Sequence, residues 1–368
     1  MSDISDDMLR TLDRIVGETM TTRIRDKAEF GPYVVPSPDG IMSWPTALWK
    51  ALTDAGFTRI AGTGADGDVS FADAMELVRR VAYHALPIPL PGIIVGRNLV
   101  AKAKGDVPDE DFGLAMVSPG QSIRFTRTPD HGWQKDGDSL YVAGYPLLNR
   151  FLAPGRGDDG IERLAIIEPG EVTCIIDANE AGESRTLVPT GTTGSLRPQR
   201  ISWIAECPDA TAKLYAMGAL ARSVQMAGAL DRVLEHCLTW VNDRVQFGKP
   251  IARFQAIQHL MAQLAAETAA AGAAVDMAID ASAESPHRFA IAIAKARTGE
   301  AAGKACAIAH EVFGAMGFTR EHTLHYSTRR LWAWRNEFGG EAYWQAEIGR
   351  QIAAGGGASL WPTLTARG

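Results

Sequence analysis

The sequence lacks an excess of basic residues and has no long apolar run. Its 37 Lys and Arg residues are outnumbered by 43 Asp and Glu residues, which gives a net charge of -6. Binding to nucleic acid requires a basic face, and a membrane helix needs about 20 consecutive apolar residues. The first residues, MSDISDDMLRTLDR, lack the basic start and apolar core of a secretion signal. We therefore expect neither a nucleic-acid-binding protein nor a membrane protein.

Cysteine is scarce, and neither cysteine nor histidine occurs in a metal-binding pattern. The four cysteines lie far apart along the chain, at Cys174, Cys207, Cys237 and Cys306. The eight histidines form no HExxH motif, which is typical of zinc hydrolases. Isolated cysteines of this kind are typical of reduced thiols in a reducing compartment. We expect a cytoplasmic protein without a metal site.

The chain does contain enough apolar sequence for a sizeable core. Hydrophobic residues make up 46% of its 368 residues and charged residues 22%, which is ordinary for a globular protein. This length allows two or three domains. The spacing of the apolar residues changes twice along the chain, and we expect three domains, over residues 1–110, 111–205 and 206–368.

Helical spacing marks the first and third regions, whereas the middle region is typical of strands. Met8, Leu12 and Ile15 share one helix face, and a long helix is predicted from Phe289 to about Phe313. Short runs such as Ser139–Ala143, separated by Gly, Pro, Asp and Asn, predict a small antiparallel β domain. Within it, residues 132–138 predict a hairpin turn. The expected fold class is therefore α+β, with a helical bundle in the third domain.

Two motifs in the third region resemble those of acyl-CoA dehydrogenases. Asp243–Gln258, DRVQFGKPIARFQAIQ, is similar to the C-terminal domain motif of that family. His310–His322, HEVFGAMGFTREH, is similar to its glycine-rich turn, and the spacing onward to Phe338-Gly339 follows the family pattern. The resemblance implies a three-domain fold of N-terminal helices, a middle β domain and a C-terminal helical bundle.

The resemblance also implies an activity and a cofactor. Family members desaturate an acyl-CoA thioester between Cα and Cβ: a carboxylate removes the Cα proton, and FAD takes a hydride from Cβ. Electrons then pass to an electron-transfer flavoprotein. The FAD site is completed across subunits, so at least a dimer is implied, as a homo- or hetero-oligomer. The positions that match cofactor-binding residues are Arg244, Gln246, Phe247, Phe254, Gln255, Glu311, Gly314 and Ala315.

This sequence departs from the family where the catalytic carboxylate is expected. The usual base position holds Phe338, and Glu337 and Glu341 are one and three residues out of register. The alternative position on the preceding helix corresponds to Gly218 or Gln225, neither of them acidic. The stretch Val117–Arg124, which matches the lining of the flavin edge, is also altered.

Three interpretations remain open. In the first, the chain is the base-lacking subunit of a heteromeric dehydrogenase, similar to bacterial proteins that act on sterol side chains or in aromatic-acid catabolism. In the second, it is an active homo-oligomer that has relocated its base to Glu337 or Glu341. Either would place it in fatty acid or steroid catabolism. The third interpretation, of another class, is a non-redox acyl-CoA-binding or regulatory relative. Because loss of a positioned base costs about 10²–10⁴-fold in rate, we favour the first and name Glu337 as the candidate catalytic residue if the second holds.

Overall fold

The computed structural model describes residues 3–22, 24, 26, 45–64, 68–104, 107–118, 120–121, 123–128, 133–144, 148–168, 175, 177–188 and 200–365. These residues form two compact units. Unit 1 contains residues 1–77 and 87–218, and unit 2 contains residues 78–86 and 219–368. Two helices contribute to both units, α4 (Phe71–Tyr83) and α6 (Ala210–Asp243). Cys174 lies outside the described residues.

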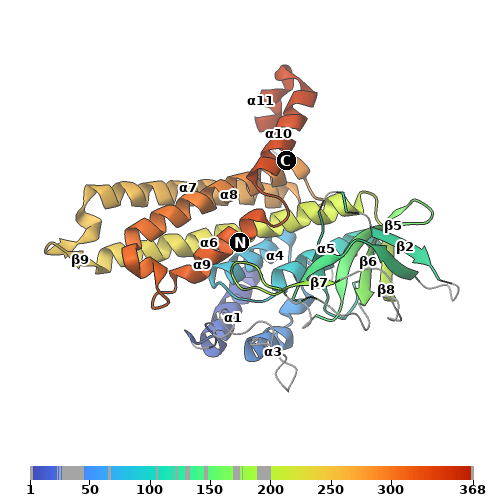
Figure 1. Ribbon diagram of the computed structural model, residues 1–368, viewed down its shortest axis with the longest axis horizontal. Coiled ribbons are helices and arrows are strands. Elements are labelled where there is room, and N and C mark those ends of the chain that lie inside the picture. The colour runs from blue at the N-terminus through green and yellow to red at the C-terminus, as the bar shows by residue number, and fades with distance from the viewer. Residues whose placement is uncertain are drawn as a thin grey trace. The chain divides into compact units, whose positions relative to one another are not determined.

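Unit 1 combines helices with an eight-stranded sheet (Figure 1). Its own helices are α1 (Asp3–Thr19), α3 (Thr46–Asp54), η1 (Phe57–Arg59) and α5 (Leu90–Lys104). The strands are β1 (Gly113–Met116), β2 (Ile123–Arg127), β3 (Trp133–Gly137), β4 (Leu140–Ala143), β5 (Phe151–Gly157), β6 (Glu162–Glu168), β7 (Arg185–Val188) and β8 (Arg200–Glu206). The expected alternation of helical and strand regions is confirmed, and α1 buries the predicted face of Leu12 and Ile15. The sheet is mixed and not antiparallel throughout, because β1 and β2 each pair with β5 in parallel.

The sheet closes on itself. Its strand order is β2-β3-β8-β6-β5-β1-β4-β7, and β2 also pairs with β5. Strands β2, β3, β8, β6 and β5 therefore form a closed ring. Strands β1, β4 and β7 extend the sheet from β5. Phe125 and Phe151 are fully buried on the apolar faces of β2 and β5. A closed ring leaves few free strand edges.

One local prediction in this region is wrong. Gly132 lies outside the described residues, and the rest of the predicted turn is largely strand β3 (Trp133–Gly137), which pairs with all five residues of β2. The run Gln134-Lys135-Asp136 shows no apolar alternation, so the sequence contains no strand signal there. The pairing with β2 and the contact of β3 with β8 select the extended backbone.

Unit 2 is a helical bundle with one small hairpin. Its elements after α6 are β9 (Val245–Gln246), β10 (Lys249–Pro250), η2 (Ile251–Arg253), α7 (Gln255–Ala281), α8 (Arg288–Phe313), η3 (Gly314–Phe318), α9 (Leu324–Asn336), α10 (Glu341–Gly355) and α11 (Gly357–Thr365). Helix α8 packs against α7, α9 and α10, which makes it the central helix of this unit. It ends at the predicted residue, Phe313, where Gly314 takes up a positive φ of 59° that glycine adopts readily.

Close helix contacts in unit 2 depend on small residues. A Cβ atom added at Gly228 of α6 would lie 2.1 Å from the Arg79 carbonyl oxygen of α4. The Arg79 side chain in turn pairs with Asp231, with its guanidinium 2.9 Å from the carboxylate. Glycine therefore allows α4 and α6 to approach closely within this unit, and the ion pair supports the contact.

Candidate functional site

The turn that contains the expected base position is held by side chains of neighbouring helices that donate hydrogen bonds to backbone carbonyl groups. It joins α9 to α10, and its Phe338 and Gly339 have φ values of 54° and 92°. Left-handed backbone is costly for phenylalanine, so surrounding contacts must stabilise it. The Lys295 ammonium donates to the carbonyl oxygens of Arg335 and Gly339, both at 2.7 Å. The Trp344 indole N–H donates to the Phe338 carbonyl oxygen at 2.9 Å.

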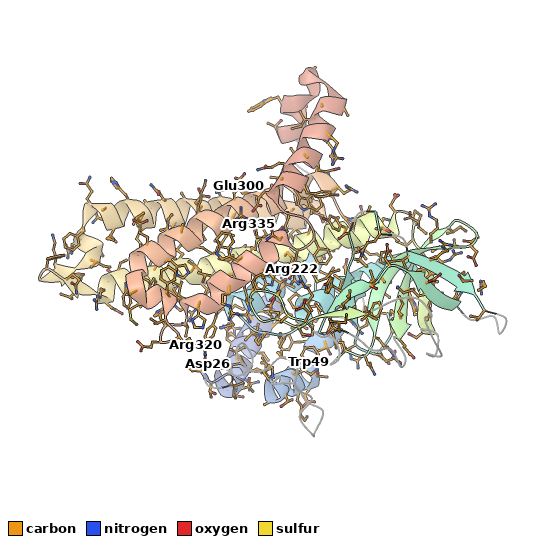
Figure 2. The ribbon with its side chains drawn as sticks, in the orientation of Figure 1. Asp26, Trp49, Arg222, Glu300, Arg320 and Arg335 are labelled. Carbon is orange, nitrogen blue, oxygen red and sulfur yellow. The ribbon has the colours of Figure 1, made fainter. Side chains whose placement is uncertain are left out.

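Glu337, the candidate base, forms a buried ion pair. Its carboxylate oxygen lies 2.6 Å from Nε of Arg222, and the two side chains are 5% and 14% exposed. Arg222 comes from α6, and Figure 2 labels it together with Arg335 of α9. A second nitrogen of Arg222 donates to the side-chain oxygen of Gln225 at 2.6 Å. One guanidinium thus connects the two places where the resemblance led us to look for a base.

Glu341, the other candidate base, is also paired. It opens α10 and contacts Arg335 at hydrogen-bonding distance. Gly299 of α8 leaves room for it, because an added Cβ there would lie 2.3 Å from a Glu341 carboxylate oxygen. Each of the two carboxylates near the expected position therefore has its own arginine.

Lys295 lies near the two arginine–glutamate pairs just described, and it is 1% exposed. Its hydrogen-bond acceptors are the two backbone carbonyls described above, which carry no formal charge. Burial lowers the pKa of Lys295 from 10.5 to about 7, although Glu341 and Glu337 oppose this shift. Lys295 can therefore lose its proton near neutral pH. In each of the two arginine–glutamate pairs the positive and negative charges cancel, so neither pair supplies a net negative charge that would hold the proton on Lys295.

The first set of candidate cofactor residues lies on and next to the β9–β10 hairpin of unit 2. Phe247 and Gly248 form its two-residue loop with φ values of 53° and 78°, as a type I′ hairpin requires. Phe247 is 92% exposed and meets Phe254 edge-on at 6.1 Å between ring centroids. Arg244, Gln246 and Gln255 are exposed as well. The hairpin therefore presents an aromatic ring and an arginine outward from unit 2.

The second set lies on the turn after α8. Gly314 and Ala315 are exposed, and no atom lies within 4 Å of a Cβ built at Gly314, so the turn is open for close approach. Glu311 is exposed one turn earlier on α8, and its negative charge works against an anion at this turn.

Stacked rings connect the two sets. The Arg244 guanidinium lies 5.8 Å from the Trp240 ring centroid, and Trp240 stacks on Phe313 at 4.8 Å. Arg244 and the Gly314 turn are thus at the same end of unit 2. An arginine, an outward aromatic ring and a glycine turn with room for close approach fit a dinucleotide with an aromatic ring system and a pyrophosphate. On this chemistry the residues present suit FAD.

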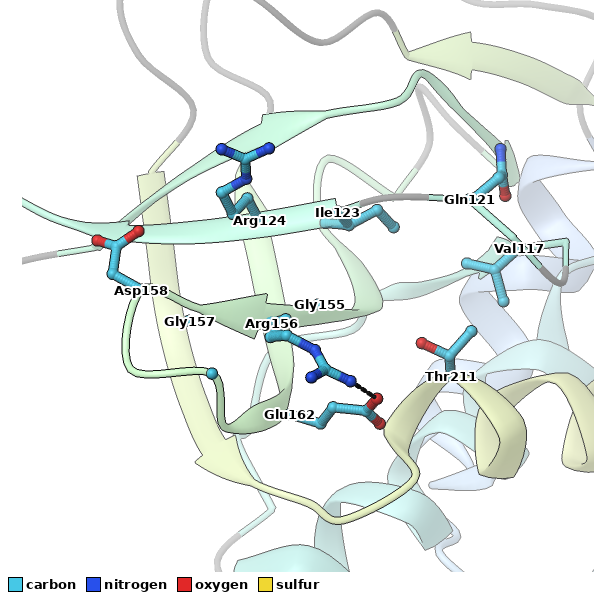
Figure 3. Close-up of a pocket in the computed structure, with 11 residues that line it drawn as sticks. Val117, Gln121, Ile123, Arg124, Gly155, Arg156, Gly157, Asp158, Glu162 and Thr211 are labelled. Atoms are coloured by element: carbon cyan, nitrogen blue, oxygen red, sulfur yellow. Dashed lines mark hydrogen bonds and ion pairs between the residues drawn. The ribbon is translucent and has the colours of Figure 1, made fainter.

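A separate cavity of about 570 Å³ lies within unit 1, at the seam where β2 pairs with β5 (Figure 3). Val117, Gln121 and Arg124 line it from the stretch that matches the flavin edge of the family. Arg156 lines it from β5 and pairs with Glu162 at 2.8 Å. The altered stretch therefore borders a real cavity, and its lining mixes apolar groups with charges of both signs.

The sequence analysis missed Arg222 and Lys295. Each is a lone charge in an apolar helical run, within GALARSVQMAGAL and FAIAIAKA respectively. A charged residue that interrupts the buried face of a helix needs a partner, so this interruption was the available signal. The partners themselves, Glu337 and the two turn carbonyls, are distant in sequence.

Two expected absences concern the described part of the chain. No three of its His, Cys, Asp and Glu residues are grouped so that they could hold a metal ion. Within the same residues, no helix has the length and apolar character to cross a membrane. Cys207, Cys237 and Cys306 are free thiols.

Comparison with known proteins identifies relatives over most of the chain. Residues 210–351 match the family model of the acyl-CoA dehydrogenase C-terminal domain. The chain is 32% identical over 274 residues to the acyl-CoA dehydrogenase IpdE2 of Mycobacterium tuberculosis, covering 73% of each protein. It is 23% identical to FadE27 of the same organism, over 83% of this chain and 88% of that one.

Solved structures agree on the fold. A chain of the ChsE4-ChsE5 complex from Mycobacterium tuberculosis superposes with a TM-score of 0.80 at 19% identity, covering 96% of this chain and 98% of that one. Butyryl-CoA dehydrogenase from Megasphaera elsdenii gives a TM-score of 0.77 at 18% identity, with 96% and 99% covered. These matches confirm the α+β acyl-CoA dehydrogenase fold. With the match to IpdE2, they show that this chain belongs to the acyl-CoA dehydrogenase family of oxidoreductases.

Proposed function

We propose that this chain is a subunit of a flavin-linked acyl-CoA dehydrogenase in which a second acyl-CoA dehydrogenase chain supplies the catalytic base. The observation that carries this proposal is the state of the carboxylates near the expected base position. Glu337 is paired with Arg222 and Glu341 with Arg335. The residues at the positions where relatives carry the base are Phe338 and, on the preceding helix, Gly218 or Gln225, and none of them is acidic.

The chemistry explains why a paired carboxylate serves poorly as the base. The Cα proton of a thioester is weakly acidic, so the base must lie within hydrogen-bond reach of Cα and gain a proton in the transition state. A carboxylate held in a buried ion pair must break that pair to reach a substrate, and breaking such a pair is strongly destabilising.

The chain's remaining contribution concerns the cofactor. Arg244, Phe247 and the Gly314 turn would hold FAD, which supplies the hydride acceptor when bound. A guanidinium suits a bidentate phosphate contact, and Phe247 offers a flat apolar surface. Because these residues point outward from unit 2, we propose that they complete a flavin site shared with another chain. The electron acceptor of the assembly would be an electron-transfer flavoprotein.

The relatives support an assembly of two different chains. One similar structure is a chain of the ChsE4-ChsE5 complex, and another is described as the Tcur3481-Tcur3483 steroid ACAD, with a TM-score of 0.80 and 19% identity. We accordingly propose an acyl-CoA with a steroid-derived acyl group as the first substrate to test.

The first experiment is the absorbance spectrum of the chain purified alone and again after co-expression with a neighbouring acyl-CoA dehydrogenase gene. In each case FAD is added and unbound flavin is removed by gel filtration. The proposal expects little flavin on the isolated chain and a stoichiometric flavin band with the partner. A stoichiometric band on the isolated chain, bleached by an acyl-CoA, would support the homo-oligomer with a relocated base instead. Binding of acyl-CoA without flavin in both preparations would support a non-redox relative.

A further inference from the structure

The carboxylate that comes closest to the family's base position is built into the interior of the helical bundle. Glu337 follows directly after α9, as its C-terminal cap residue. Its residue exposure is 6%, and its partner Arg222 comes from α6, an element distant in sequence. The indole ring of Trp334, itself 1% exposed, lies 5.9 Å from the Arg222 guanidinium carbon. A charge pair enclosed by aromatic and apolar groups is weakly screened by water.

The guanidinium has a second fixed contact, which restricts its orientation. One of its terminal nitrogens donates to the Gln225 amide oxygen at 2.6 Å while Nε faces Glu337 at 2.6 Å. Gln225 is 4% exposed and lies one helical turn after Arg222 on α6. The three side chains therefore form one bridge, Gln225–Arg222–Glu337, which joins α6 to the turn before α10.

The backbone of that turn is held independently. Lys295 from α8 donates to the carbonyl oxygens of Arg335, at the end of α9, and of Gly339 in the turn, and Trp344 from α10 donates to that of Phe338. A change in the backbone conformation of this turn, which would be needed to move Glu337 away from Arg222, would consequently break several buried hydrogen bonds. Two sets of contacts therefore fix the position of Glu337: the ion pair of its carboxylate with Arg222, and the hydrogen bonds that hold the backbone around it.

We infer that Arg222 is a positioning residue that withholds Glu337 from acid–base chemistry and makes it a structural anchor of the bundle. This inference rests on the proposed function, in which the base comes from a second chain, and adds the residue that keeps this chain's own carboxylate out of the reaction. Arg222 acts through Glu337, and the Lys295 contacts keep the turn in place.

The first test measures the reactivity of Glu337 directly in the full-length chain. Carboxylates are coupled to glycine ethyl ester with a water-soluble carbodiimide under native conditions, and the modified peptides are counted by mass spectrometry. Asp158, which is exposed, is the internal reference. We expect Glu337 to be labelled at least about 10-fold less than Asp158, because it is buried and paired. Equal labelling of Glu337 and Asp158 in the chain without substitutions would overturn the inference.

Variants at Arg222 give the second readout. Arg222→Met should raise the labelling of Glu337 by about 10-fold, since its partner is gone, whereas Arg222→Lys should restore part of the protection because it keeps a positive charge. Arg156→Gln, which removes an exposed pair with Glu162, is the matched control and should leave Glu337 labelling unchanged. If Glu337 is labelled to the same extent in folded Arg222→Met and in the chain without substitutions, the inference is contradicted.

A double-mutant cycle keeps the test decisive if Arg222→Met folds poorly. Removal of one partner from a buried pair typically reduces the folding equilibrium constant by about 100-fold or more. Replacement of both partners by apolar residues, in Arg222→Met with Glu337→Leu, should recover at least about 10-fold of that loss. If the two single losses simply add in the double variant, the bridge is absent and the inference is wrong.

These measurements need neither flavin nor acyl-CoA, so they stand apart from the test of the proposed function. A colourless protein in every assembly would reject the dehydrogenase subunit while leaving the labelling and the cycle interpretable. Conversely, an assembled, flavin-containing enzyme that loses about 100-fold in turnover on Glu337→Gln, with an unchanged melting temperature, would identify Glu337 as the base and overturn the inference.

Discussion

The buried Lys295 should make the stability of this protein rise with pH above neutrality. Its pKa is lowered from 10.5 to about 7 in the folded chain, chiefly by burial. Between these values the unfolded chain binds the proton and the folded chain does not. The free energy of unfolding therefore increases with pH in this window. At low pH the cost of burying the charge approaches about 5 kcal/mol, since each pKa unit is worth about 1.4 kcal/mol.

The magnitude is best measured over a narrow range. From these pKa values, the Lys295 contribution changes by about 1.6 kcal/mol between about pH 7 and about pH 8.5. Above about pH 9 a second effect opposes it. Burial raises the pKa values of Cys237 and Cys306 to about 12, so their thiols ionise first in the unfolded chain and lower stability as the pH rises. The window must end below that pH.

The assay is urea unfolding at several pH values, followed by tryptophan fluorescence. Lys295→Met is the comparison, because it keeps an unbranched apolar chain and removes the titrating group. Lys135, whose pKa burial lowers to about 8, adds a slope of the same sign in both proteins, so the difference between them cancels it. We expect the variant to be less dependent on pH by about 1.6 kcal/mol over the window. Identical pH dependence of the two proteins would refute the reasoning.

Three further predictions concern other parts of the chain. Gly228→Ala should lower the free energy of unfolding by about 3 kcal/mol or more, measured by urea denaturation, because its Cβ would lie 2.1 Å from a backbone oxygen. Trp344→Phe should cost about 1–3 kcal/mol in the same assay, since the Phe338 carbonyl loses its 2.9 Å donor; an unchanged midpoint would show that the bond adds nothing. Phe247→Ala should leave stability within about 0.5 kcal/mol, as its ring is 92% exposed. It should nevertheless weaken FAD binding by the assembled protein in a flavin fluorescence titration, and unchanged binding would remove Phe247 from the cofactor site.

The sequence predicted most of the secondary structure because the relevant signals are local. Apolar residues at helical spacing predicted a helix from Phe289 to about Phe313, and α8 occupies Arg288–Phe313. The prediction for residues 132–138 failed because β3 is selected by pairing with β2, a contact between segments that local alternation does not encode. Propensity is a weak guide where a short polar strand is stabilised mainly by its neighbours.

The candidate cofactor residues were also found from sequence, through motifs that occupy short segments. The structure adds that Arg244 and the Gly314 turn lie at the same end of unit 2, connected through Trp240 and Phe313. That connection joins the ends of two helices, and spacing along the chain does not reveal it. Their role in binding FAD remains the prediction tested above.

For the catalytic carboxylate, the sequence determined which acidic residues are near the expected position, and only the tertiary structure decided their partners. Glu337 and Glu341 could be named from register alone, together with the absence of an acid at Phe338. Their pairing with Arg222 and Arg335 followed from the packing of α6, α9 and α10. The physical reason is that the chemistry of a carboxylate depends on charges within a few ångströms and on burial, and the folding of the chain sets both.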